Sequence, residues 1–266
     1  MAYAGKNTVI IGGSHGLGLA TAKAIVSQGG KLILTGRRPE PAAAAEKELN
    51  SIQADSAVGI QSDITSHDDH AEIEKRVESF FGTGEVIDFL FVNVGYAGFA
   101  PAIATTAEFY DMHFDTNTRG PIFLTQRLVP HMRPGSSIVF TTSVSIGSGY
   151  PTMGIYSASK AAIYSYAQTL AAELARRPDG KAGIRVNSLS PGFMDTPSMG
   201  VRGLPAEDKE KFLGIGASTT PMGRVGTQEE VAKAAVWLGF DATYTTGTEL
   251  LVDGGSRYLG FPLEGH

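Results

Sequence analysis

The chain has 266 residues, of which 42% are hydrophobic and 18% charged, so it can bury a sizeable core and is too apolar for a disordered protein. Its formal net charge of −5 provides no basic surface for nucleic acid. The absence of cysteine excludes disulfides, thiolate metal sites and a cysteine nucleophile. Because the sequence begins without an apolar leader and has no run of 18 apolar residues, we expect a soluble, cytoplasmic protein that binds no membrane.

Short apolar runs alternate with longer helical segments along the chain. Strands are predicted at 8–11, 31–35, 58–61, 87–92, 137–141, 184–189 and 249–252, and helices at about 16–28, 39–51, 68–81, 115–132, 155–175 and 228–239. This alternation predicts a single α/β domain over 1–266, with a doubly wound (Rossmann) seven-stranded parallel sheet covered by helices on both faces. Segment 193–222 is rich in Gly, Ser, Thr, Pro and Met, and we expect it to be a mobile flap over a pocket.

A glycine-rich turn joins the first predicted strand to the first predicted helix. Gly12, Gly16 and Gly18 allow a tight turn and a close backbone approach at a helix N-terminus, where free N–H groups bind phosphate. The position of this turn at the start of an alternating α/β chain predicts a dinucleotide site. The intervening residues, Ser14, His15 and Leu17, are included in that site, although His15 is equally compatible with a solvated loop.

The end of the second predicted strand indicates which dinucleotide binds. An acidic residue there would hold a ribose 2′-hydroxyl, whereas arginine would accept a 2′-phosphate. This chain has no carboxylate at that point and has Arg37 and Arg38, whose planar guanidinium groups suit phosphate. The sequence therefore favours NADP(H) as the cofactor, the alternative being that both arginines belong to a solvated surface loop.

Tyr156 and Lys160 lie four residues apart, and Ser143 lies 156 − 143 = 13 residues before the tyrosine. Residues four apart on a helix share one face, so the phenol and the ammonium are expected to meet one substrate. A nearby positive charge lowers the pKa of a phenol, and we expect Lys160 to prepare Tyr156 for acid-base catalysis in this way. The pair alone is weak evidence, because an amphipathic helix often carries an aromatic residue and a solvated lysine.

Together, the glycine turn, the Tyr-x-x-x-Lys pair and the upstream serine resemble the short-chain dehydrogenase/reductase family over nearly the whole chain. The resemblance implies a catalytic tetrad of Asn117, Ser143, Tyr156 and Lys160, with Tyr156 as general acid, Lys160 also binding the ribose and Asn117 holding a water. It also implies further cofactor-binding residues, namely Asp63, Ile64, Asn93, Gly95, Pro191, Gly192 and Thr196. The implied activity is the NADPH-dependent interconversion of a small or medium-sized, fairly apolar ketone or aldehyde and its alcohol, by a homotetramer or homodimer.

Two departures from the family pattern fall near the cofactor turn. Ile11 replaces the usual threonine, and Val92 and Val94 replace an asparagine and an alanine beside Asn93. Replacing both members of a buried polar pair with apolar groups can be nearly neutral. We therefore expect an inter-strand polar tie to be replaced here by packing, which requires Ile11 to lie beside the two valines.

Other residues are weaker candidates for metal binding or for a substrate pocket. The segment 66–70, which contains two histidines and two aspartates, is better explained by a helix cap at Ser66 than by metal binding, and no metal is expected. An apolar substrate pocket or ordinary core packing would explain Tyr150, Phe193, Met194, Met199 and Met222 equally well. Two other functions remain: a non-catalytic NADP-binding sensor or scaffold, and an enoyl reductase, whose family members space the tyrosine and lysine farther apart.

Overall fold

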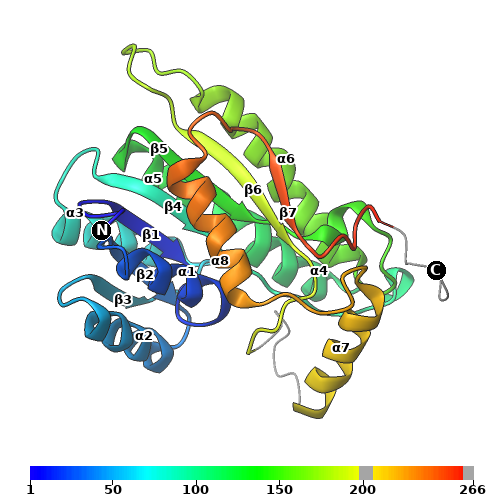
Figure 1. The fold of residues 1–266 in the computed structure, drawn as a ribbon. Helices are drawn as coiled ribbons and strands as arrows, with labels where there is room; N and C mark the ends of the chain where they lie inside the picture. Colours follow the sequence, from blue (N-terminus) through cyan, green and yellow to red (C-terminus); the bar gives the residue numbers. More distant parts are fainter. Residues whose placement is uncertain (198–205, 260–266) are drawn as a thin grey trace.

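The computed structural model describes residues 1–197 and 206–259 (Figure 1). Over these residues seven strands form one parallel sheet in the order β3-β2-β1-β4-β5-β6-β7. The strands are β1 (Asn7–Ile11), β2 (Lys31–Gly36), β3 (Ala57–Gln61), β4 (Ile87–Val92), β5 (Met132–Thr141), β6 (Arg185–Pro191) and β7 (Glu249–Val252). The predicted doubly wound α/β fold is confirmed.

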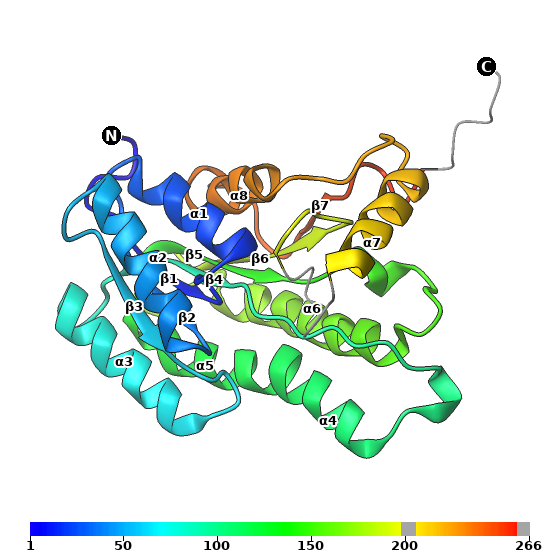
Figure 2. The same cartoon turned by 90° about the horizontal axis from the view of Figure 1, so that it is seen from below.

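Helices cover both faces of the sheet (Figure 2). One face carries α1 (Gly16–Val26), α2 (Pro39–Ile52) and α8 (Gln228–Val236). The other carries α3 (His67–Phe81), α4 (Ala107–Phe114), α5 (Gly120–Leu128) and α6 (Gly154–Leu174). The remaining described helix, α7 (Ala206–Thr219), stands near the carboxyl end of β6, where Gly216 approaches the ring of Phe193. No helix in the described ranges is long and apolar enough to cross a membrane.

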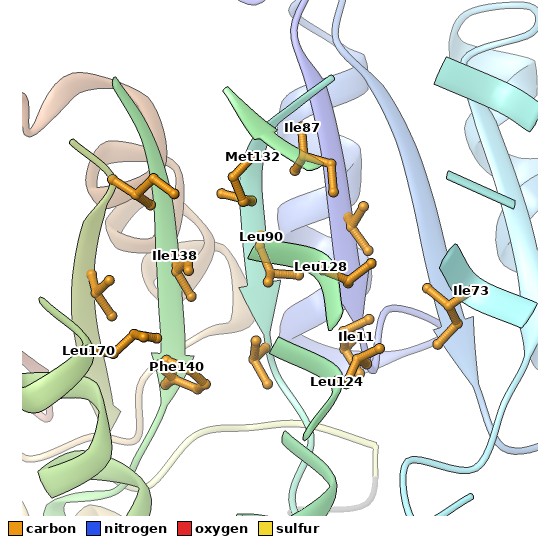
Figure 3. Close-up of a cluster of buried hydrophobic side chains, with 14 of the residues drawn as sticks. Ile11, Ile73, Ile87, Leu90, Leu124, Leu128, Met132, Ile138, Phe140 and Leu170 are labelled. Atoms are coloured by element: carbon orange, nitrogen blue, oxygen red, sulfur yellow. The ribbon is translucent and has the colours of Figure 1, made fainter. Parts of the chain in front are cut away.

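The strands are buried on both sides, so their alternating side chains build two cores. In β1, Val9 and Ile11 belong to the core under α3, α5 and α6, whereas Ile10 points into the core under α1, α2 and α8. Figure 3 shows the first core, in which Leu124 of α5 and Ile73 of α3 lie close to Ile11. Burying a side chain of this size contributes roughly 1.5–3 kcal/mol, and this burial on both faces explains the continuous apolar runs in the sequence.

The departures near the cofactor turn are accommodated by packing. Ile11 is the register partner of Val92 in the β1–β4 pair, and both are buried in the same apolar core. Val94 packs against that core from the adjoining loop. The three apolar residues therefore lie together, as the replacement of a polar tie by packing requires.

Two helical regions differ from the prediction. The predicted helix at 115–132 begins earlier, in α4, passes through a π turn at Asp115–Arg119 and continues as α5. Segment 193–222 contains α7, which the sequence did not predict because its two glycines weaken both helix propensity and the apolar period. The flap prediction also includes residues 198–205, which lie outside the described residues, and the mobility of the segment stays a prediction.

The order of the strands determines where a ligand can bind. The chain moves outward from β1 through β2 to β3 and then returns to β4 on the opposite side of β1. In such sheets, a crevice opens at the carboxyl ends of the strands where the direction reverses.

The predicted helix cap at Ser66 is confirmed. Its Oγ accepts a hydrogen bond from the Asp69 backbone N–H (3.2 Å) at the start of α3.

Candidate active site

A cleft of about 820 Å³ opens at this reversal of strand direction. All the predicted site residues line it except two, Gly18 and Asn117. Both lie next to the cleft and contact residues that line it. A Cβ at Gly18 would overlap the carbonyl oxygen of Gly12, so the close approach of helix α1 to the turn requires glycine.

The glycine turn is fixed by hydrogen bonds from three strands. Gly12 has a φ of 82°, its N–H donates to the Thr35 hydroxyl (3.1 Å), and its carbonyl accepts from the Asn93 amide (3.0 Å). Asn93 in turn accepts a hydrogen bond from the Thr141 hydroxyl at the end of β5 (2.9 Å). At the start of α1, the His15 side chain makes no capping hydrogen bond, which leaves the first-turn N–H groups of the helix available to a ligand.

Positive groups gather beside this turn. Arg37 and Arg38 are exposed, and neither has a carboxylate within 4 Å among the residues that the structure describes. His15 lies beside them, and its pKa is lowered by burial and then by the charges of Arg38 and Arg37. Its ring Nδ1 is 3.1 Å from the Ser14 hydroxyl. This end of the cleft is therefore suited to an anion.

Ser143, Tyr156 and Lys160 converge at the centre of the cleft. Ser143 follows β5 and begins a 3₁₀ turn (Val144–Gly147), where its Oγ accepts the Ser145 backbone N–H (3.2 Å). Tyr156 and Lys160 lie on α6, as predicted. Burial raises the pKa of Tyr156, and a hydrogen bond with the Ser143 hydroxyl partly offsets this effect.

Lys160 does not have the predicted effect on the tyrosine. Its ammonium donates to the backbone carbonyls of Val94 (3.0 Å) and Thr141 (2.8 Å), and the residue is only 2% exposed. Burial raises the pKa of Tyr156, and the smaller opposing effect comes from the hydrogen bond with Ser143. Burial lowers the pKa of Lys160 itself to about 7. The expectation that Lys160 brings the phenol pKa down is therefore wrong, because the lysine is directed at the backbone carbonyls of the strand ends.

Asn117 has a structural partner for each polar atom of its side chain. In the π turn before α5, its Oδ1 accepts the Tyr96 N–H (2.7 Å), and its Nδ2 donates to the Tyr96 carbonyl (2.9 Å) and the Ser159 hydroxyl (2.9 Å). Ser159 precedes Lys160 on α6. Asn117 thus ties the loop after β4 to the helix that carries the tyrosine and lysine, while its role in holding a water stays a prediction.

Comparisons with known proteins agree with this geometry. A family model described as enoyl-(acyl carrier protein) reductase matches residues 12–257. An L-fucose dehydrogenase of Oryctolagus cuniculus is 30% identical, covering 96% of this chain and 86% of the relative, and a hydroxynaphthalene reductase-like protein Arp2 of Metarhizium brunneum is 29% identical over 95% of each. The crystal structure of a short-chain dehydrogenase/reductase (glucose/ribitol dehydrogenase) from Brucella melitensis is 27% identical, with a TM-score of 0.85 over 97% of this chain and 99% of that one.

The chain belongs to the short-chain dehydrogenase/reductase family. As a member it is an oxidoreductase, and the family uses nicotinamide cofactors. The family resemblance inferred from the glycine turn and the Tyr-x-x-x-Lys pair is therefore confirmed.

The sequence did not reveal every residue in the cleft of this short-chain dehydrogenase/reductase. Of the apolar candidates, Tyr150, Phe193 and Met194 line the cleft, whereas Met222 is 62% exposed and does not. Met199 lies outside the described residues. The lining residues that the sequence did not single out include Tyr96, Phe99, Ser145, Met153 and Phe212. No short motif marks them, because they come from loops and from the unpredicted α7.

A second network supports the serine turn from the C-terminal side. The Thr142 and Ser190 hydroxyls lie 2.7 Å apart, and Ser190 donates to Glu249 (2.6 Å). Glu249 also pairs with Arg257 (2.5 Å), and both side chains are 11% exposed. The Arg257 guanidinium occupies the space that a Cβ at Gly147 would need, so the segment after β7 packs on the turn that begins at Ser143.

The buried pair gives a stability prediction. Glu249→Gln should destabilise the protein by about 3–5 kcal/mol, because it leaves the Arg257 guanidinium buried without a carboxylate. The double variant Glu249→Leu/Arg257→Met should recover part of that loss. Glu48→Gln, which breaks the exposed Lys23–Glu48 pair, is the control and should cost less than about 1 kcal/mol. Urea unfolding measures all three, and equal losses for the Glu249 and Glu48 variants would contradict the assignment.

The pKa of Lys160 predicts how stability depends on pH. The unfolded chain holds this proton up to a pKa of 10.5, and the folded chain releases it near 7, so the unfolded state binds more protons between these values. The contribution of Lys160 to stability should therefore rise with pH across this window.

Lys160→Met removes this contribution and should flatten the rise by up to about 1.4 kcal/mol per pH unit. Lys47→Met, on the exposed face of α2, serves as the control and should keep the wild-type slope. The measurement is the unfolding free energy of the ligand-free protein from pH 7 to 10. Superimposable slopes for wild type and Lys160→Met would contradict the assignment.

Proposed function

We propose that this short-chain dehydrogenase/reductase interconverts a ketone or aldehyde and its alcohol with NADP(H). The observation that carries the proposal is the convergence of Ser143 and Tyr156 in one cleft with the glycine turn and with Arg37 and Arg38. The relatives' names extend from an L-fucose dehydrogenase to a hydroxynaphthalene reductase-like protein, so names alone do not indicate the substrate. We also propose that it acts in the cytoplasm as a homotetramer or homodimer.

The residues present fit a dinucleotide. The free N–H groups at the start of α1 and the close backbone approach at Gly12 and Gly18 suit a pyrophosphate. Arg37 and Arg38 would hold a ribose 2′-phosphate, and Asp63 and Ile64 line the neighbouring wall. The other predicted contacts, Asn93, Gly95, Pro191, Gly192 and Thr196, follow the cleft toward the catalytic residues.

When bound, the cofactor supplies the hydride for the carbonyl carbon. Ser143 and Tyr156 orient the carbonyl oxygen by donating hydrogen bonds, and they stabilise the negative charge that develops there. As the carbon–oxygen π pair becomes an O–H bond, the Tyr156 phenol gives its proton to the oxygen. A proton from solvent then restores the Tyr156 phenol, along a path that passes Lys160 and the Asn117 loop. Since burial raises the pKa of Tyr156, the phenol stays protonated at neutral pH, which suits the reduction direction.

Two alternatives are disfavoured. A non-catalytic NADP-binding sensor or scaffold would not need Ser143, Tyr156 and Lys160 in one cleft. Enoyl reduction, named in the description of the family model, is not supported by the spacing of four residues between Tyr156 and Lys160, because family members with that activity are expected to space the two farther apart.

Removing the phenol hydroxyl tests the mechanism. Tyr156→Phe should lower kcat by roughly 10²–10⁴-fold, because the variant has no group to protonate the carbonyl oxygen, while the Kd for NADPH changes little. Tyr164→Phe, two turns farther along α6 and outside the cleft, is the matched control and should keep full activity. Turnover follows the loss of NADPH absorbance with a panel of ketones. A wild-type protein that binds NADPH and reduces none of them would favour the sensor.

Removing the two guanidinium groups tests the choice of cofactor. Arg37→Ala/Arg38→Ala should weaken NADPH binding by at least roughly 10- to 100-fold, as expected for the loss of charge-assisted hydrogen bonds, and should leave NADH binding almost unchanged. Arg76→Ala, an exposed charge on α3, controls for the change in net charge. Isothermal titration with each cofactor gives the answer. Equal losses for NADPH and NADH would refute NADP specificity.

A further inference from the structure

The cleft has an aromatic end, lined by Tyr96, Phe99, Tyr150, Met153, Phe193 and Phe212. The Phe212 ring lies 5.8 Å from that of Phe99 and 5.7 Å from that of Phe193, with interplanar angles of 48° and 54°. These three rings come from the loop after β4, the segment after β6 and helix α7. Elements distant in sequence thus bring their aromatic side chains to one wall. Aromatic rings attract one another at this spacing, so the wall favours a substrate that carries an aromatic ring.

Charge is segregated to the opposite end. Four of the five basic or acidic lining residues, His15, Arg37, Arg38 and Asp63, belong to the cofactor turn and the ends of β2 and β3. The remaining one, Lys160, directs its ammonium to two backbone carbonyls. Among the described residues, the aromatic end is lined by no Asp, Glu, Asn, Gln or Arg. A sugar there would bury several hydroxyl groups against few partners, which is unfavourable.

We propose that the substrate is an uncharged ketone on a planar aromatic ring system. The aromatic ring packs on Phe212 and its neighbours, while Ser143 and Tyr156 hold the reacting oxygen. This inference rests on the proposed carbonyl reduction and specifies its substrate class.

Matched substrates test the aromatic end. With NADPH, kcat/KM for 1-tetralone should exceed that for 1-decalone, its saturated bicyclic counterpart, by about tenfold, and NADP⁺-dependent oxidation of L-fucose should be slower than either reduction. Phe212→Leu should remove most of the tetralone preference, because it keeps an apolar side chain but loses the ring. Phe123→Leu, at an exposed site on α5, should preserve it. Equal rates for the two ketones, or faster turnover of L-fucose, would overturn the proposal.

Ketone reduction without aromatic preference refutes this inference alone, whereas no reduction of any carbonyl refutes the proposed function as well.

Discussion

The amide of Asn93 joins the ends of three strands, and the cleft depends on that junction. It donates to the Gly12 carbonyl after β1 and accepts from the Thr141 hydroxyl at the end of β5, while it follows β4 itself. A parallel sheet leaves the backbone groups at its carboxyl edge without ladder partners, so they need side chains to satisfy them. By satisfying them, Asn93 holds the glycine turn at a fixed distance from the strand that leads to Ser143.

The same edge explains the state of Lys160. The carbonyls of Val94 and Thr141 are two more strand-end acceptors, and the lysine binds both from α6. Burying an ammonium group is costly, and this cost lowers the pKa of Lys160 toward neutrality. The lysine therefore has a structural task, because it fastens α6 to the sheet.

The sequence predicted the parts of the fold and site that depend on short-range patterns. Buried strands give continuous apolar runs, the turn at Gly12 needs glycine for its backbone, and residues four apart on a helix share a face. The electrostatics of Tyr156 could not be predicted in this way, because burial and the direction of Lys160 are tertiary properties. Helix α7 could not be predicted either. Its glycines lower the helix propensity of the segment, and its stability comes from contacts such as that between Gly216 and Phe193. The Glu249–Arg257 pair depends on how the segment after β7 folds over Gly147, which no local spacing encodes.

The two ends of the cleft impose different physical demands, and the catalytic residues lie where they meet. At the glycine turn, N–H groups and guanidiniums attract an anion, and exposure to water lowers the cost of keeping their charges. At the aromatic end, apolar rings exclude water and strengthen any hydrogen bond made beside them. Tyr156 and Ser143 stand at this boundary, where the proposed carbonyl oxygen would meet preorganised donors in a poorly hydrated environment. Because the rings that create this environment come from a loop and from α7, substrate choice can change through these segments while the strand ends that hold the cofactor site stay the same.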